Sequence, residues 1–361
     1  MGEEHPGVSE QSGLRHDVET LCAPEMAGRA PGTPGGALSA AYVEERMREV
    51  GLEPGGEDGY RQAIPPIGGS SVLGVLRGTG DGWVLLAAHH DHLGDWGGGT
   101  CWGANDNAAA VAVMLQAAGF LAGRSRRLRR SVLFCAFDAE EPPYFMGPYM
   151  GSQWFVDHPT IPLRDVDLMI ALDLVGTRLG PPGLPPEVGE SIFMQGAETS
   201  TGTRDLVDGV PVVRGIRPRH ITDWVIASMS DQHAFREAGI PWLFYTVGRD
   251  ARYHTPADTP ETLDYPKMAA LAEHLGLLIS AAADAEGRRE YIADPAGDGA
   301  MLESLTELLG HLAELVPDAA ATLEVVEGLA GRVQEGRLDD EERAIVGGII
   351  RGLEQGLGGN P

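Results

Sequence analysis

The chain has 361 residues, enough at roughly 100–200 residues per domain for two domains or for one large enzyme core with an appendage. The 50 glycines and 25 prolines stay below the level of low-complexity chains, and 43% hydrophobic residues suffice for a sizeable core. The 53 acidic and 27 basic residues give a net charge of −26, which repels phosphates and anionic lipid and argues against nucleic acid and membrane partners.

The first 60 residues predict two helices joined by a turn. Residues 14–22 are short and amphipathic, and residues 28–35 form a turn-rich loop. Residues 37–50 are rich in Ala, Glu and Met and stop at Gly51, a common residue at helix C-termini. Because residues 1–21 contain no apolar stretch, they do not predict a signal peptide. We therefore expect a cytoplasmic protein, or a secreted one if the sequence is a trimmed form.

From residue 71 onward, short apolar runs alternate with helical segments. The predicted strands span residues 72–76, 83–88, 131–137, 168–175, 191–194 and 241–247. The predicted helices span residues 107–121, 149–157, 231–238 and 265–283. Near-continuous apolar strands separated by helices indicate an α/β sheet that is covered on both faces.

The C-terminal part predicts a separate helical unit. Residues 284–300 are polar and turn-rich, as expected of a linker. Residues 301–361 carry leucines at helical spacing, and Pro317 and residues 336–338 divide them into three helices. We interpret this unit as an extension that buries one face on the core. A self-association element or an active-site lid stays as the alternative, and the oligomeric state is left open.

Five segments concentrate residue types that bind metal ions, and four of them lie just after a predicted strand. They are His89-His90-Asp91-His92, Gly103-Ala104-Asn105-Asp106-Asn107, Asp138-Ala139-Glu140-Glu141, Asp173-Leu174-Val175-Gly176 and Tyr253-His254-Thr255-Pro256-Ala257-Asp258. In open α/β sheets, ligands bind outside the carboxyl ends of the strands, so segments at that edge converge. Histidine with carboxylates is a set that zinc accepts, and a position left for water makes such a site catalytic.

Together and in this order, the five segments resemble the motifs of the di-zinc aminopeptidase family of metallopeptidases. That family includes bacterial leucine-type aminopeptidases, glutamate carboxypeptidase II-like enzymes and glutaminyl cyclases. The resemblance covers about residues 14–283 and includes the Gly-Arg-x-x-Gly-Thr loop at residues 28–33. It implies a mixed, mostly parallel central sheet flanked by helices, a three-layer sandwich, with a C-terminal all-helical appendage. We accordingly expect a catalytic domain of residues 1–283, a linker of residues 284–300 and an extension of residues 301–361.

The resemblance also implies two Zn²⁺ ions per chain and a role for each ligand. One ion is implied at His89 and Asp173. The second is implied at Glu141 and His254, and Asp106 is implied to bridge the two. Two Zn²⁺ ions carry four positive charges, and the carboxylates of Asp106, Glu141 and Asp173 balance three of them. The fourth is balanced when a bridging water loses a proton.

Three further residues have implied catalytic or supporting roles. Glu140 is implied as the general base that takes the proton of the water and delivers it to the leaving amine. We expect Asp91 to accept a hydrogen bond from His89 and fix its tautomer. Tyr253 resembles a donor to the oxyanion, with packing beside His254 as the alternative.

Other polar residues near the motifs are not assigned to metal. Because side chains alternate along an extended segment, His90 points away from His89, and we expect both His90 and His92 to be non-ligands. A direct role of His233 is in doubt, because its spacing departs from the family pattern. We expect Asp258 to orient the loop around the last histidine ligand rather than to bind metal.

The resemblance implies a zinc metallo-exopeptidase acting on peptides, and we expect an aminopeptidase that hydrolyses the N-terminal peptide bond. The predicted apolar pocket residues are Met146, Phe235, Trp242 and Phe244. Two alternatives use the same scaffold: a glutaminyl-peptide cyclotransferase with one zinc, and a carboxypeptidase in which Arg249 and Arg252 hold the substrate carboxylate. A non-catalytic protein that works through residues 301–357 is not expected, because no position of the ligand set is missing.

Overall fold

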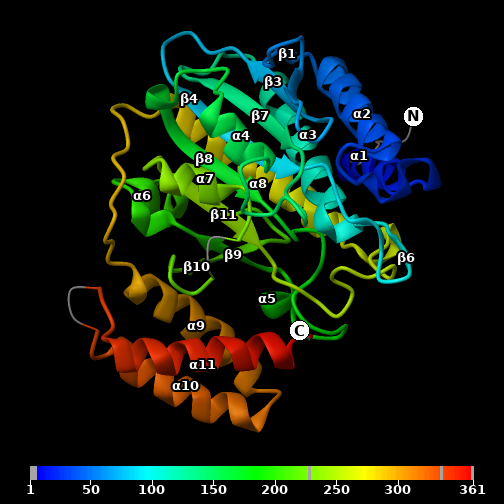
Figure 1. The fold of residues 1–361 in the computed structure, drawn as a ribbon. Coiled ribbons are helices and arrows are strands. Elements are labelled where there is room, and N and C mark those ends of the chain that lie inside the picture. Colours follow the sequence, from blue (N-terminus) through cyan, green and yellow to red (C-terminus); the bar gives the residue numbers. More distant parts are fainter. Residues whose placement is uncertain (1–5, 227–228, 334–335, 359–361) are drawn as a thin grey trace, which may run out of the picture.

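The computed structural model describes residues 6–226, 229–333 and 336–358 (Figure 1). The ends of the predicted N-terminal and C-terminal segments, residues 1–5 and 359–361, lie outside the described residues. The strands are β1 (Glu53–Pro54), β2 (Arg61–Ile64), β3 (Gly69–Leu76), β4 (Trp83–His89), β5 (Gly94–Trp96), β6 (Gly99–Cys101), β7 (Ser131–Phe137), β8 (Val166–Leu172), β9 (Ser191–Gln195), β10 (Arg217–Ile221) and β11 (Trp242–Thr246). The helices are α1 (Pro6–Leu21), α2 (Pro34–Val50), α3 (Ala109–Ala122), α4 (Gly151–Asp157), α5 (Pro186–Gly189), α6 (Thr203–Asp208), α7 (Gln232–Glu237), α8 (Tyr265–Asp284), α9 (Asp298–Ala313), α10 (Pro317–Ala330) and α11 (Asp340–Gly356).

A mixed sheet forms the centre of the molecule. Its strand order is β1-β3-β7-β4-β8-β11-β9-β10, with β2 beside β3. Strands β7, β4, β8 and β11 are parallel neighbours, whereas β3 and β9 pair antiparallel with the two outer members of this group. Every residue of β7 and β8 is buried, as the continuous apolar runs predict for strands covered on both faces. The predicted mixed, mostly parallel sheet between helices is confirmed.

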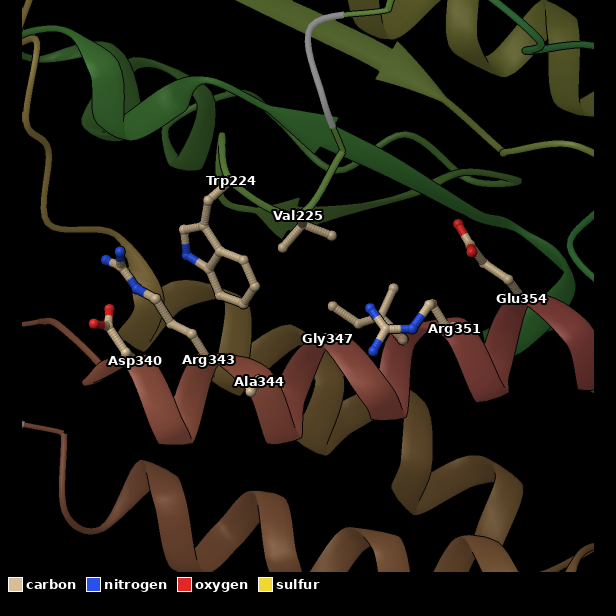
Figure 2. Close-up of a pocket in the computed structure, with 9 residues that line it drawn as sticks. Trp224, Val225, Asp340, Arg343, Ala344, Gly347, Arg351 and Glu354 are labelled. Carbon is tan, nitrogen blue, oxygen red and sulfur yellow. The ribbon is translucent and has the colours of Figure 1, made fainter.

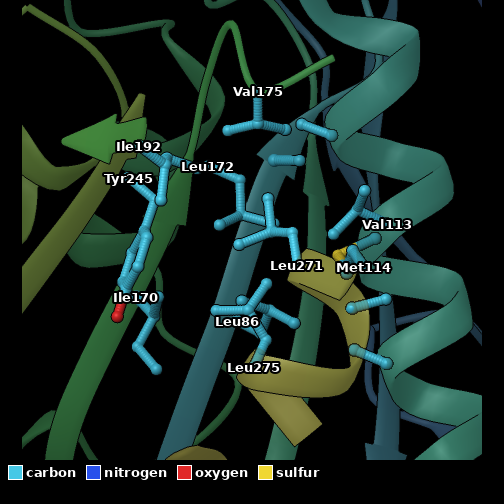
Figure 3. Packing of buried hydrophobic residues seen from close by; sticks show 14 of the residues in the cluster. Leu86, Val113, Met114, Ile170, Leu172, Val175, Ile192, Tyr245, Leu271 and Leu275 are labelled. Atoms are coloured by element: carbon cyan, nitrogen blue, oxygen red, sulfur yellow. The ribbon is translucent and has the colours of Figure 1, made fainter. Parts of the chain in front are cut away.

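Helices cover both faces of the sheet and complete its core (Figure 1). On one face, Leu86 of β4 packs with Val113 of α3 and Leu271 of α8 in a large apolar cluster (Figure 3). On the other face, Phe155 of α4 and Phe235 of α7 cover the same strands. The sheet is therefore held rigidly from both sides, which fixes the edge at which its parallel strands end.

Predicted and observed elements differ mainly where the chain enters the candidate site. Strand β8 ends at Leu172, whereas the prediction extended it to residue 175. The φ of Leu174 is +55°, which is incompatible with a β-strand. Helix α3 begins at Ala109 because Asp106 and Asn107 have non-helical backbone angles. Strand β10 was not predicted, since its sequence, Arg-Pro-Arg-His-Ile, has no apolar run. It is an edge strand, where proline is tolerated.

The C-terminal helices α9, α10 and α11 lie together beyond the β9–β10 end of the sheet (Figure 1). The backbone N–H of His220 in β10 donates to Ser304 Oγ of α9 at 2.9 Å, so α9 covers this edge of the sheet. Helix α9 starts at Asp298, three residues before the expected start of the extension. None of the helices in the described residues has the length and apolar character of a membrane span.

A buried carboxylate joins the extension to the core. Asp298 at the start of α9 accepts hydrogen bonds from Trp224 Nε1 and from the backbone N–H of Leu338, both at 2.7 Å. A cavity of about 330 Å³ separates α11 from residues 224–225 beside this contact (Figure 2). The nearby Glu198 accepts from the backbone N–H of Asp223 at 2.7 Å. The junction therefore contains the buried Asp298 carboxylate, with the half-buried Glu198 close to it.

The stability of this junction is expected to fall as the pH rises through the titration of Glu198. Burial, with the neighbouring Asp223 and Asp298 carboxylates, raises the pKa of Glu198 from 4.5 to about 7. Between those values the unfolded chain binds fewer protons, so the folded state loses roughly 3 kcal/mol on going from pH 4.5 to above pH 7. The Glu198→Gln variant should lack this loss in urea unfolding at pH 5 and pH 8. Identical pH dependence in both proteins would contradict it.

Candidate metal centre

The candidate ligands converge at one edge of the sheet. His89 is the last residue of β4, Glu141 lies in the loop that follows β7, and Asp173 follows β8. Because β4 is parallel to both β7 and β8 and lies between them, the carboxyl ends of the three strands meet there. The loop before α3 brings Asp106, and the loop after β11 brings His254. The structure therefore brings all five expected ligands together.

One cluster forms around His89, whose side chain is completely buried. Its Nε2 atom lies 3.6 Å from Asp173 Oδ1 and 3.8 Å from Glu140 Oε2. Burial raises the pKa of the Glu140 carboxyl well above its ordinary value, and the Asp173 and Glu141 carboxylates add to this effect. The cluster thus gathers one imidazole and two carboxylates away from water.

A second cluster forms around His254. Its Nε2 atom lies 3.2 Å from Asp106 Oδ2 and 3.2 Å from Glu141 Oε2. His92 belongs to this cluster as well, because its Nδ1 atom is 2.7 Å from Glu141 Oε1. Burial lowers the pKa of His92 to about 3, so its ring is neutral.

Asp106 lies between the two clusters. Its Oδ1 atom is 3.5 Å from His89 Nε2, and its Oδ2 atom faces His254. The backbone N–H groups of Asn105 and Asp106 donate to the Asp258 carboxylate at 2.8 and 3.1 Å. Asp258 therefore holds the loop of Asp106 in place, whereas its expected role in orienting the loop around His254 stays a prediction. The Asp106 carboxylate thus presents Oδ1 to the cluster around His89 and Oδ2 to the cluster around His254.

The unpaired atoms of the two clusters fit divalent metal ions. Among the described residues, His89 Nε2, Asp173 Oδ1 and His254 Nε2 are buried without a hydrogen-bond partner. Such atoms are costly unless something binds them. Two ligands of one tetrahedral zinc ion, each at roughly 2.0–2.1 Å, are about 3.3 Å apart. The separations of 3.2–3.6 Å that join His89 and His254 to Asp106, Glu141 and Asp173 agree with that value.

Asp91 supports both clusters from behind. Its carboxylate accepts hydrogen bonds from the backbone N–H groups of Glu140 and Glu141, each at 3.1 Å. The expected contact with His89 is longer: His89 Nδ1 lies 3.5 Å from the Asp91 carboxylate and 3.3 Å from its carbonyl oxygen. Asp91 therefore fixes the backbone of the glutamate pair and also faces the far nitrogen of His89.

Tyr253 packs against a candidate ligand. Its ring stacks on the His254 ring with centroids 3.7 Å apart, and the Arg249 guanidinium lies 4.5 Å from the Tyr253 ring centroid. Burial raises the pKa of the Tyr253 hydroxyl above its ordinary value. This contact is the packing alternative given above, and the stacked ring also restricts the orientation of His254.

Some expectations about neighbouring residues are wrong. The strand alternation used to set His92 aside does not hold, because β4 ends at His89 and the ring of His92 reaches Glu141; that His92 is not a metal ligand stays a prediction. Phe235, Trp242 and Phe244 are buried in the apolar core and are not exposed as pocket-wall residues would be. Met146 is 43% exposed and remains a candidate for the pocket wall.

The sequence analysis missed the role of Arg29, which connects the loops of both clusters. Arg29 is completely buried. Its guanidinium donates to the carbonyl oxygens of His90 at 2.9 Å, Trp102 at 2.7 Å and Gly103 at 2.8 Å, and to that of Leu21 at 2.7 Å. The only signal was its place in the Gly-Arg-x-x-Gly-Thr loop, whose own residues bind no metal.

The Arg29→Met variant is expected to lose at least about 3 kcal/mol of stability, because four buried carbonyl groups lose their donor. Its zinc content should fall as well, since the loops that carry His89 and Asp106 are no longer joined. Denaturant unfolding and metal analysis test this, with Arg164→Met as a control at an exposed arginine. Equal stability and zinc content in the two variants would show that Arg29 does not organise the site.

Three comparisons place the chain among known proteins. Residues 71–279 match the model of peptidase family M28. The uncharacterized protein YfbL of Escherichia coli (strain K12) is 27% identical over 274 residues, which cover 67% of this chain and 79% of YfbL. The match to the family model includes the segments that carry His89, Asp106, Glu140, Glu141 and Asp173.

Solved structures of low sequence identity share the fold. The Legionella pneumophila LapA aminopeptidase has a TM-score of 0.60 and 17% identity, covering 79% of this chain and 77% of LapA. A Zn-dependent exopeptidase from Parabacteroides distasonis has a TM-score of 0.55 and 18% identity, covering 75% and 97%. The Porphyromonas gingivalis glutaminyl cyclase has a TM-score of 0.54 and 18% identity, covering 74% and 97%. Since the family model spans more than half of the chain, the protein belongs to peptidase family M28 and is a metallopeptidase.

Proposed function

We propose that the protein is an aminopeptidase that hydrolyses the N-terminal peptide bond of peptides with two Zn²⁺ ions. The observation that carries this proposal is the position of Asp106, whose two oxygens face His89 on one side and His254 on the other. Only a carboxylate offers two such oxygens to ions roughly 3.5–4 Å apart.

The proposed ligand sets follow from this arrangement. His89, Asp173 and Asp106 hold the first ion. Glu141, His254 and Asp106 hold the second ion. When bound, the two ions would polarise the scissile carbonyl and lower the pKa of the attacking water to roughly 7.

Glu140 is the proposed general base. Its carboxylate lies beside His89 at the first subsite, and no hydrogen bond to it is found among the described residues. It is therefore free to accept a proton from the attacking water and to deliver that proton to the leaving amine. Asp91, which binds the backbone N–H of Glu140, keeps the carboxylate next to the cluster.

The charges around the site favour a substrate with a free amino terminus over one with a free carboxylate. Asp231 is buried near His89, and burial raises the pKa of its carboxyl to about 7, so it carries only part of a negative charge at neutral pH. The arginines that a carboxypeptidase needs are engaged elsewhere. Arg252 pairs with Asp250, and Arg249 lies over the Tyr253 ring. These contacts make the two arginines less available to a substrate carboxylate, which supports a substrate with a free amino terminus.

A substrate panel tests the proposal. Aminoacyl-anilides, their N-acetylated counterparts, peptides with N-terminal glutamine and peptides blocked at the amino end only are incubated with zinc and with a chelator. We expect hydrolysis of substrates with a free amino group, its loss with the chelator and its return with zinc.

Two other outcomes would replace the proposal. Ammonia release from glutaminyl peptides without amide hydrolysis would indicate a glutaminyl cyclase. Cleavage of amino-blocked peptides at the carboxyl end would indicate a carboxypeptidase. The first residue of the anilides that are cleaved fastest would show which side chain the pocket accepts.

The proposed domain organisation keeps residues 1–283 as the catalytic domain, residues 284–300 as the linker and residues 301–361 as the extension. The contacts of α9 with β10 support a role of the extension in covering the sheet edge. Removing residues 301–361 should therefore expose β10 and promote aggregation. A truncated chain that stays monodisperse and active would favour a separate role such as self-association.

A further inference from the structure

His92 contacts the candidate metal ligand Glu141 directly. The His92 Nδ1 atom lies 2.7 Å from Glu141 Oε1, and both side chains are buried. This distance is that of a hydrogen bond, and it is shorter than the roughly 3.3 Å expected between two ligands of one tetrahedral zinc ion. The contacts of His254 with Glu141 and Asp106, at 3.2 Å, agree with ligand separations. His92 therefore contacts Glu141 at the distance of a hydrogen bond, whereas His254 lies at the separation expected of a second ligand of the same ion.

The two oxygens of Glu141 are divided between these histidines. Oε1 faces His92, and Oε2 lies 3.2 Å from His254 Nε2. His92 Nδ1 is 3.9 Å from Asp106 Oδ2, too far for a hydrogen bond. If His92 donates a hydrogen bond to Glu141 Oε1, then Glu141 Oε2 is the oxygen that faces His254 and the second metal subsite.

The position of the His92 ring is set by the backbone around it. A Cβ atom at Gly103 would lie 2.5 Å from His92 Cγ and 2.6 Å from its Cδ2, so the loop passes the ring as closely as a glycine permits. Gly103 also has a φ of +60°, which favours glycine. Arg29 holds this loop through the Gly103 carbonyl at 2.8 Å. The ring therefore has little freedom to turn away from Glu141.

We propose that His92 is a positioning residue that donates through Nδ1–H to Glu141 Oε1 and thereby aims Oε2 at the second metal subsite. This inference rests on the two-metal site of the proposed function. Outer hydrogen bonds of this kind are worth about 10–100-fold in metal affinity. The predicted effect is confined to the second ion, because no atom of the first cluster depends on this bond.

The test measures the two zinc dissociation constants of the full chain by competition with a chelator. In His92→Leu, which fills the space but cannot donate, we expect zinc at the second subsite to bind about 10–100-fold more weakly, with the first subsite unchanged. His92→Asn places an amide N–H near the position of Nδ1 and should recover most of the affinity. The matched control is His90→Leu, since the ring of His90 is also buried but binds Ser39 Oγ and Ser70 O outside the clusters.

The possible results separate a positioning role from other roles. Unchanged affinities in His92→Leu, or equal weakening of both ions, overturn the inference. A loss that His92→Asn does not restore, with an altered visible spectrum of the Co²⁺-loaded chain, identifies His92 as a ligand and also overturns it. If His92→Leu does not fold, His92→Gln, whose donor is shifted toward the Nε2 position, replaces it with the same expectation.

The failure of this inference differs from that of the proposed function. Two bound Zn²⁺ ions with selective weakening in His92→Leu support the positioning role even when no peptide is hydrolysed. A wild-type chain that binds a single Zn²⁺ ion overturns it, because there is then no second subsite to position.

Discussion

Replacing Glu140 with alanine is expected to lower kcat about 10²–10⁴-fold while both metal subsites stay filled. The carboxylate of Glu140 lies near His89, but the closest ligand contacts of the clusters are made by Asp106, Glu141, Asp173 and the histidines. Its loss therefore removes the group that moves the proton, whereas the proposed ligands remain. The backbone N–H of residue 140 still reaches Asp91, so the local structure should persist.

The measurement compares kcat and zinc content in Glu140→Ala and Glu141→Ala. The neighbouring variant is the matched control, because it removes the same side chain one residue later. In Glu141→Ala the second ion should be lost together with activity, since its carboxylate faces His254 at 3.2 Å. Equal loss of metal in the two variants would show that the proposed division of roles between the adjacent glutamates is wrong.

Replacing Asp106 with alanine is expected to abolish activity by weakening zinc binding at both subsites. Each oxygen of Asp106 faces a different histidine, so a single substitution removes one ligand from each ion. The loss at each subsite should exceed the roughly 10–100-fold that follows removal of an outer hydrogen bond. The histidines and the remaining carboxylates are then too few to hold two ions side by side.

Metal analysis after dialysis checks this prediction, with Asp95→Ala as the control. Asp95 lies in the exposed β5–β6 hairpin and accepts a hydrogen bond from Thr100 Oγ1 at 2.6 Å, away from the clusters. Full zinc content in Asp106→Ala, or loss of only one ion, would mean that Asp106 does not bridge the two subsites.

The central fold and the gathering of the candidate ligands could be predicted because each depends on patterns along the chain. The apolar runs of β4, β7 and β8 are continuous, and polar residues follow each run where it ends. A parallel sheet brings such ends together whatever the intervening sequence is. The segment of His254 lies shortly after the predicted strand 241–247 and fits the same pattern, whereas the segment of Asp106 precedes a predicted helix and was found by its residue types and by the resemblance.

Other features depend on contacts between distant segments and could not be read from local patterns. Arg29 donates to backbone carbonyls of residues about 60–75 positions away. Because every residue has a backbone carbonyl, these partners cannot be identified from residue type. The contact of His92 with Glu141 was missed because the alternation of a strand was extended past the end of β4 at His89. Phe235 was placed in a pocket from its position alone, but the layer of α4 and α7 buries it in the core.

Zinc titration of the chelator-treated protein, with bound zinc and peptide hydrolysis followed together, tests the two-metal account most directly. We predict two Zn²⁺ ions per chain and hydrolysis that depends on their return. Binding of a single ion would contradict the bridging role of Asp106. Hydrolysis that continues in the metal-free protein would contradict the proposed mechanism as a whole.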